Sequence, residues 1–137
     1  MEAKKITLED AILLARQMED QIATLKLQVE SLQNEGLKIS LAKTTISELK
    51  KVDAKAYLIP IVGNVLLKVK DVNKEKVIVG IGASIYVEKN PDEAIEILNK
   101  KINRIEKIIG DFSYRIEVLR MQAIDLEEKI RKAIQKG

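Results

Sequence analysis

The sequence predicts an α+β fold: a long antiparallel helical coiled coil whose two helices are separated by two β-hairpins. Residues 7–50 and 91–135 repeat apolar side chains at steps of three and four, as in helices that pair along a seam. Residues 56–89 are rich in Val, Ile and Leu and contain turn residues. Aromatic residues form only 3% of the chain, which favours aliphatic seams over a compact globular core. A length of 137 residues indicates one domain, residues 1–137.

The first helix is predicted over residues 7–50. Thr7 and Asp10 have the spacing of a capping box, with Asp in the place of the usual Glu. At Gly36 the seam lacks a side chain, and the apolar residues after it continue in a shifted phase, which predicts a local change in supercoiling. The seam comprises Leu8, Ala11, Ala15, Met18, Ile22, Leu25, Val29 and Leu32, then Ile39, Ala42, Ile46 and Leu49.

The second helix is predicted over residues 91–135. Asn90 suits the N-cap, Pro91 the first helical position, and Glu93 completes a capping box. A helix of this length with a single apolar stripe is not stable alone in water, so we expect the two helices to fold back on each other. The seam comprises Ile95, Leu98, Ile102, Ile105, Ile109, Phe112, Ile116, Leu119, Ala123, Leu126, Ile130 and Ala133.

The segment 56–89 is predicted to form two β-hairpins. Gly63-Asn64 and Gly82-Ala83 supply the turns, and Pro60 places its strand at an edge or a bulge. Isolated hairpins are marginal in water, and unpaired strand edges accept strands from other chains. We therefore interpret the hairpins as an oligomerisation platform, a β-barrel or sheet that joins subunits. The predicted oligomerisation residues are Tyr57, Leu58, Ile59, Ile61, Val65, Leu66, Leu67, Val69, Val77, Ile78, Val79, Ile81, Ile85, Tyr86 and Val87.

Off-seam apolar residues gather where the start of the first helix and the end of the second are expected to meet. Ile12, Leu13 and Leu14 point in different directions around a helix, so one partner helix cannot bury them all. A partly exposed apolar tip of this kind is typical of a binding surface. The alternative is that these residues fill gaps or make further oligomer contacts. The predicted tip residues are Ile6, Leu8, Ile12, Leu13, Leu14, Ile124, Leu126, Ile130 and Ile134.

The sequence predicts neither a catalytic site nor a metal or cofactor site. Histidine and cysteine are absent, which removes the commonest general base, the thiol nucleophile and the commonest metal ligands. Gly80 and Gly82 lack the third glycine and the following helix of a dinucleotide-binding loop, so a turn within a sheet is the simpler interpretation. Carboxylate pairs such as Glu127 and Glu128 lie among Lys and Arg, as on a solvated helix surface. We predict that the protein is not an enzyme.

Charge and hydropathy limit the kinds of partner that we expect for the chain. The 24 basic and 21 acidic residues are interspersed, which indicates a solvated surface and not a nucleic-acid interface. The sequence contains no apolar run near the length of a membrane span and no signal peptide, so we predict a cytoplasmic protein with no membrane partner.

Two stretches of the chain carry a resemblance to a known family. The segments "YLIPIVGNVLLKVK" and "VIVGIGASIYVEKN" are similar to the two-hairpin signature of α-class prefoldin subunits. As in that signature, the first strand contains a proline and the third strand is rich in Val and Gly. Val62 and Asn64 stand where the family often has Gly, a departure that leaves the type of the first turn open. The resemblance covers essentially the whole chain.

The resemblance implies an ATP-independent chaperone that holds non-native proteins at the tips of its coiled coil. It implies assembly with a β-class prefoldin subunit, and delivery of clients to a group II chaperonin in archaeal or eukaryotic cytosol. Some archaeal relatives instead assemble alone into filaments. The second hypothesis is therefore a self-assembling filament or scaffold subunit with the hairpins as the polymerisation interface.

Overall fold

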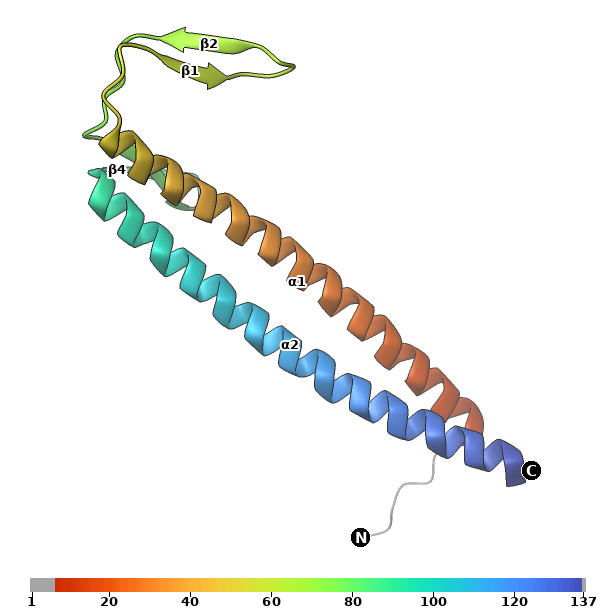
Figure 1. The fold of residues 1–137 in the computed structure, drawn as a ribbon. Helices are drawn as coiled ribbons and strands as arrows, with labels where there is room; N and C mark the ends of the chain where they lie inside the picture. The colour runs from red at the N-terminus through yellow and green to blue at the C-terminus, as the bar shows by residue number, and fades with distance from the viewer. Residues whose placement is uncertain (1–6, 137) are drawn as a thin grey trace. The chain divides into compact units, whose positions relative to one another are not determined.

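The computed structural model describes residues 7–136 as two helices with four strands between them (Figure 1). The order is α1 (Leu8–Lys51), β1 (Tyr57–Pro60), β2 (Leu66–Val69), β3 (Val77–Gly82), β4 (Ile85–Lys89) and α2 (Pro91–Lys136). The predicted fold class, two long helices with two intervening hairpins, is therefore confirmed. Within these residues, no helix has the length and apolar character needed to cross a membrane.

Each helix begins at the cap that the sequence predicts. The Thr7 hydroxyl accepts a hydrogen bond from the Asp10 amide at 3.1 Å, which satisfies one of the free amides at the start of α1. At the start of α2, the Glu93 amide donates to Asn90 Oδ1 at 2.8 Å, and the Asn90 side-chain amide donates back to the Glu93 carboxylate. This reciprocal capping box fixes the residue at which the chain leaves β4 and becomes helical.

The first hairpin closes through a β-turn with Gly63 and Asn64 at its centre, and the Ile61 amide donates to the Val65 carbonyl at 2.9 Å. Tyr57 pairs with Val69 and Pro60 with Leu66 in an antiparallel ladder. Gly63 and Asn64 both have positive φ, +61° and +63°, and the Val65 amide donates to the Val62 carbonyl at 3.3 Å. Positive φ at both central residues defines a type I′ turn, whose twist matches that of the flanking strands. This geometry settles the turn type that Val62 and Asn64 left open.

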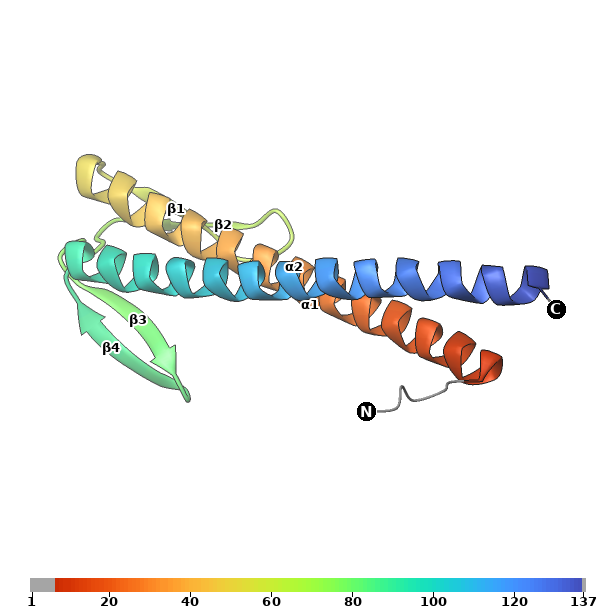
Figure 2. The same cartoon turned by 90° about the horizontal axis from the view of Figure 1, so that it is seen from below.

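The second hairpin turns one residue later than predicted. Its turn residues are Ala83 and Ser84, with φ of +50° and +60°, and Gly82 belongs to β3, where it pairs with Ile85. The shift arises from an irregularity between Gly80 and Gly82 that places one extra residue in β3. The two hairpins form separate two-stranded sheets, and the described residues contain no closed barrel (Figure 2).

The chain divides into two compact units. The terminal unit comprises Met1–Glu35 with Ile105–Gly137 and therefore contains the described start of α1 and most of α2. The hairpin unit comprises Gly36–Arg104, which includes both hairpins. Buried apolar residues in the terminal unit are Ala15, Leu25, Ile105, Ile116 and Ala123; in the hairpin unit they are Val79, Ala94 and Leu98.

Burial along the helices follows the predicted seams except at Leu8 and Ala133, which are exposed near the helix ends, and at Ala42. Ala42, predicted to lie on the seam after Gly36, is exposed, whereas Lys43 is half-buried. Ile39 and Ile46 are half-buried as predicted. The seven-residue repeat therefore continues through Gly36 without the predicted change of phase, because the aliphatic stem of a lysine can occupy a seam position.

In the hairpin unit, three lysines link the helices with each other and with the segments between them. The Lys50 ammonium forms an ion pair with Asp92, which joins the end of α1 to the start of α2. Lys101 of α2 donates to the Gly80 carbonyl of β3. Lys74, between the hairpins, donates to the Val52 carbonyl, and its Nζ lies 5.8 Å from the centre of the Tyr57 ring. These contacts hold the connecting segments without a buried charge.

Candidate functional site

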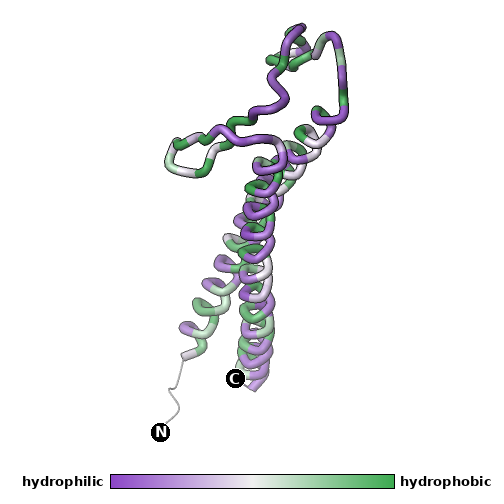
Figure 3. The backbone as a smooth tube through the Cα atoms, turned by 90° about the vertical axis from the view of Figure 1, so that its left-hand side faces the viewer, coloured by the Kyte–Doolittle hydropathy of each residue, from purple (hydrophilic) through white to green (hydrophobic). Residues whose placement is uncertain are grey.

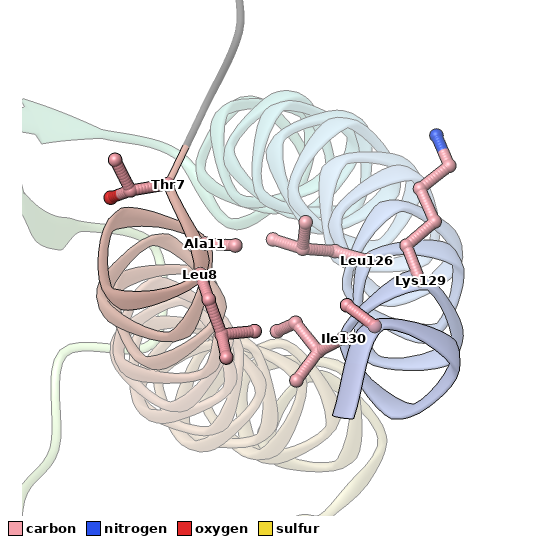
Figure 4. Close-up of a pocket in the computed structure, with 7 residues that line it drawn as sticks. Thr7, Leu8, Ala11, Leu126, Lys129 and Ile130 are labelled. Carbon is pink, nitrogen blue, oxygen red and sulfur yellow. The ribbon is translucent and has the colours of Figure 1, made fainter. Parts of the chain in front are cut away.

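An apolar pocket lies in the terminal unit, where the first turn of α1 meets the last turns of α2 (Figure 4). Its volume is about 280 Å³. In Figure 4, Leu8 and Ala11 on α1 point toward Leu126 and Ile130 on α2, while the Lys129 ammonium points away from the pocket. The residues that line this terminal pocket are Thr7, Leu8, Ala11, Leu126, Lys129, Ile130 and Ala133.

The pocket brings together three of the predicted tip residues: Leu8, Leu126 and Ile130. Ile12, Leu13, Ile124 and Ile134 do not line it, but each exposes more than a third of its surface, with Leu13 at 56% and Ile134 at 59%. Leu14 is half-buried, and Ile6 lies outside the described residues. The terminal unit therefore presents apolar surface both inside the pocket and beside it. Figure 3, which colours the backbone by hydropathy, shows hydrophobic residues recurring along both helices.

Four pocket residues were not among the predicted tip residues: Thr7, Ala11, Lys129 and Ala133. The sequence signal for two of them was available, because Ala11 and Ala133 occupy seam positions. Alanine on a seam leaves space that a leucine or isoleucine would fill. Small seam residues close to the helix ends were therefore the pattern that predicts a hollow here.

The charges around the pocket are exposed and paired along α2. Lys129 Nζ lies 3.2 Å from the Asp125 carboxylate, and Lys132 Nζ lies 3.8 Å from Glu128. Glu19 on α1 faces Glu127 on α2, and a hydrogen bond between the two carboxyl groups, with their mutual repulsion, raises the pKa of Glu19. The pocket has no buried charge, so its chemistry is that of an apolar binding surface with a polar rim.

The hairpins expose large apolar side chains on both faces. Leu58, Ile78 and Tyr86 have the highest exposed fractions among the predicted oligomerisation residues, at 63%, 70% and 68%. Tyr57, Val69, Val77 and Val87 are half-buried, and Val79 is buried within the chain. Those that expose more than a third of their surface are Leu58, Ile59, Ile61, Val65, Leu66, Leu67, Ile78, Ile81, Ile85 and Tyr86. Short two-stranded sheets with this much apolar surface and free edges are suited to pairing with other chains.

A second hollow, of about 370 Å³, lies in the hairpin unit. Ile46 and Leu49 of α1 form part of its lining. The rest comes from residues 72–74 and 76 of the segment that leads into β3, from the first two residues of β3, and from Pro91. The residues from 7 to 136 contain no group of three or more acidic, histidine or cysteine side chains that could hold a metal ion.

Comparison with known proteins assigns the family. The model of the prefoldin subunit family matches residues 18–136. A prefoldin subunit alpha of Methanococcus aeolicus is 33% identical over 76% of this chain and 78% of its own length. The chain belongs to the prefoldin family. A second prefoldin subunit alpha, from Methanosarcina barkeri, is 29% identical over 88% of each chain.

A solved prefoldin structure has the same fold. It is the filamentous prefoldin of Methanocaldococcus jannaschii, which matches 89% of this chain and 96% of its own with a TM-score of 0.60 at 23% identity. Prefoldin subunits are chaperones and not enzymes, so the family assignment confirms the prediction that the chain has no enzymatic role. They also assemble into oligomers with other subunits.

Proposed function

We propose that this chain is an ATP-independent holdase that binds non-native proteins at the terminal pocket and the exposed apolar residues beside it. The observation that supports this proposal is the pocket itself, an open apolar hollow between helix ends that holds no charge in its interior. A single pocket of this size binds an unfolded segment weakly. Several copies joined in one assembly bind one flexible client much more tightly, because linked sites raise the effective concentration.

The proposed assembly forms through the hairpins. Exposed apolar strand residues such as Leu58 and Ile78 support this proposal, because their surface is too large for a monomer to leave uncovered at no cost. The partner is either a β-class prefoldin subunit or further copies of this chain. We propose the cytoplasm as the location and a group II chaperonin as the recipient of the client.

A double variant at the exposed helix ends tests client binding. Leu13→Ser with Ile134→Ser removes two apolar side chains that are 56% and 59% exposed, so the fold and the assembly should persist. We expect weaker suppression of aggregation of a heat-unfolded enzyme, followed by light scattering. The matched control is Leu27→Ser, because Leu27 is 67% exposed on the same helix but does not lie at its end. Equal protection by the wild type and the double variant would exclude these residues from client binding.

The second candidate function is a self-assembling filament subunit. The observation that favours it is the similarity of the fold to a prefoldin that forms filaments. Mass measurement and electron microscopy of the purified chain separate the two hypotheses. Long filaments from this chain alone support the second, whereas a small species that becomes a closed complex on addition of a one-hairpin β-class subunit supports the first.

A further inference from the structure

A second apolar stripe lies on α2 opposite its seam. Tyr114, Val118 and Met121 are spaced by four and three residues, so they share one face of the helix. The exposed fractions of these residues are 72%, 36% and 70%. Ile116 and Ala123, which are buried, each follow a stripe residue by two positions, about 200° around the helix. The stripe therefore faces away from the residues that α2 buries, and the seam does not account for it.

The stripe is flanked by opposite charges at equal spacing. Lys107 precedes Tyr114 by seven residues, and Glu128 follows Met121 by seven. Seven residues are about two helical turns, so all four side chains lie on one line along α2. Lys107 and Glu128 are both exposed, and the Glu128 carboxylate also lies 3.8 Å from Lys132 Nζ on its own helix, a surface pair that Lys107 of a second copy would share. Along this line the order is cation, aromatic ring, thioether and anion.

This order is complementary to itself when it is reversed. If two α2 helices lie antiparallel about a two-fold axis near Val118, Tyr114 of one copy meets Met121 of the other. Lys107 then meets Glu128. A thioether beside an aromatic ring is a favourable contact, and each contact occurs twice in a two-fold interface. We propose that this stripe is a docking face for a second copy of this chain, with the two α2 helices antiparallel.

Acidic residues near the proposed contact are already paired on their own helix. Glu117, close to the two-fold axis, forms an ion pair with Arg120. Asp111 would face Asp125 of the second copy, and the Asp125 carboxylate lies 3.2 Å from Lys129 Nζ. These cations reduce the repulsion that unpaired carboxylates would produce across the interface.

The outer face of α1 lacks an equivalent stripe. Leu13, Leu27 and Leu41 are exposed at intervals of fourteen residues, but Asp20 and Asn34 lie midway between them. Leu37 is exposed one turn before Leu41, but polar residues occupy the next turn on either side of this pair. A second copy that docked there would have to cover the Asp20 charge and the Asn34 amide between the leucines. The continuous apolar stripe with charges at its ends is therefore the surface that fits another copy.

The contact is small, because only three apolar side chains from each copy take part. A stable dimer covers about 800 Å² on each partner, well above what three side chains supply. The contact is therefore weak on its own and takes effect at high local concentration, between chains that are not joined to each other through their hairpins, because α2 begins at Pro91, directly after β4. It does not depend on client binding at the terminal pocket.

Cysteine cross-linking tests the proposed pairing, because the sequence of 137 residues contains no cysteine. Chains with Tyr114→Cys are mixed with chains with Met121→Cys under mild oxidation. One Cys–Cys contact forms while the opposite Tyr114–Met121 contact of the same dimer is retained. We expect mixed dimers to form about tenfold faster than dimers of either variant alone, in accord with a preference of roughly 1.4 kcal/mol.

The matched control pair is Ser113→Cys mixed with Gln122→Cys. These exposed residues are each one position outside the stripe, at the same levels along α2 but turned about 100° in opposite directions. Linking of this pair as fast as the stripe pair would indicate random collision and overturn the proposal. Fast self-linking of the Tyr114→Cys chain would indicate parallel helices and would also overturn it, as would the absence of any linking.

A charge exchange provides an independent readout. Lys107→Glu in both cysteine chains brings two acidic groups together at each end of the stripe, and we expect the rate of mixed linking to fall about threefold to fivefold. Addition of Glu128→Lys restores opposite charges and should restore the rate. Failure of the double exchange to recover the rate would contradict antiparallel pairing of these two residues.

Discussion

Filling the terminal pocket with a larger side chain of the protein itself should change client binding and stability in opposite directions. Ala11 lines the pocket and is half-buried, so Ala11→Leu would direct a larger side chain into it. The substitution adds three carbon atoms, each of which stabilises the fold by about 0.8 kcal/mol when fully buried. A cavity of about 150 Å³ can hold benzene, so the pocket volume of about 280 Å³ leaves room for them.

We expect Ala11→Leu to raise the free energy of unfolding by about 1–2 kcal/mol, because the pocket is open to water on one side. For a chain of this length the melting temperature should rise by roughly 3–6 °C, measured by circular dichroism. Protection of a heat-unfolded client should decrease at the same time, because the new side chain occupies the space in which a client side chain would bind. Most substitutions lower the stability of a protein. A higher melting temperature together with weaker client protection would therefore point to the pocket as the client site.

The matched control is Ala23→Leu on the same helix. Ala23 is exposed and does not line the pocket, so its replacement should change neither the melting temperature nor client protection appreciably. Higher stability of Ala11→Leu with undiminished protection would refute the assignment of the pocket as a client site. Lower stability would refute the pocket geometry itself, since it would mean that three carbon atoms do not fit.

Three further predictions concern the rest of the chain. Glu127→Gln should raise the melting temperature at pH 7 but not near pH 4. In the folded chain the pKa of Glu19 is raised above its usual 4.5, so repulsion between the two carboxylates costs stability as pH rises through that pKa; a pH-independent gain would exclude this cause. Ala83→Gly should stabilise the second hairpin by about 1 kcal/mol, because Ala83 has φ of +50°, and hydrogen exchange of the Val87 amide would report it. Ile116→Ala should destabilise the terminal unit by about 2–5 kcal/mol in urea titration, because Ile116 is buried; a loss below 1 kcal/mol would contradict its packing.

The helices and the first hairpin could be predicted because their signals are local. Asn90 and Glu93 lie three residues apart and form reciprocal hydrogen bonds that need no contact with distant parts of the chain. Gly63 and Asn64 are residues that tolerate positive φ, so the turn they form needs no distant contact. The turn of the second hairpin was misplaced by one residue. Its position depends on an extra residue in β3, a feature of strand pairing that the turn residues do not encode.

The phase of the first seam was misread for a similar reason. The apolar Ala42 was predicted to lie on the seam, yet its neighbour Lys43 is the half-buried residue. A lysine has an aliphatic stem that packs and a charge that reaches water, and residue type alone does not show which property a site uses. The spacing of seven residues was the better guide here than the polarity of the residue.

The terminal pocket shows where residue type and position must be considered together. The seams contain alanine at several levels, and Ala15 and Ala123 are buried, at 7% and 5% exposure. Ala11 and Ala133 instead line an open hollow beside the larger Leu8, Leu126 and Ile130. An alanine inside a seam lets two helices approach, whereas an alanine close to a helix end lacks the next turn that would close over it. The same residue therefore tightens the coiled coil in its interior and opens a binding surface where the coil ends.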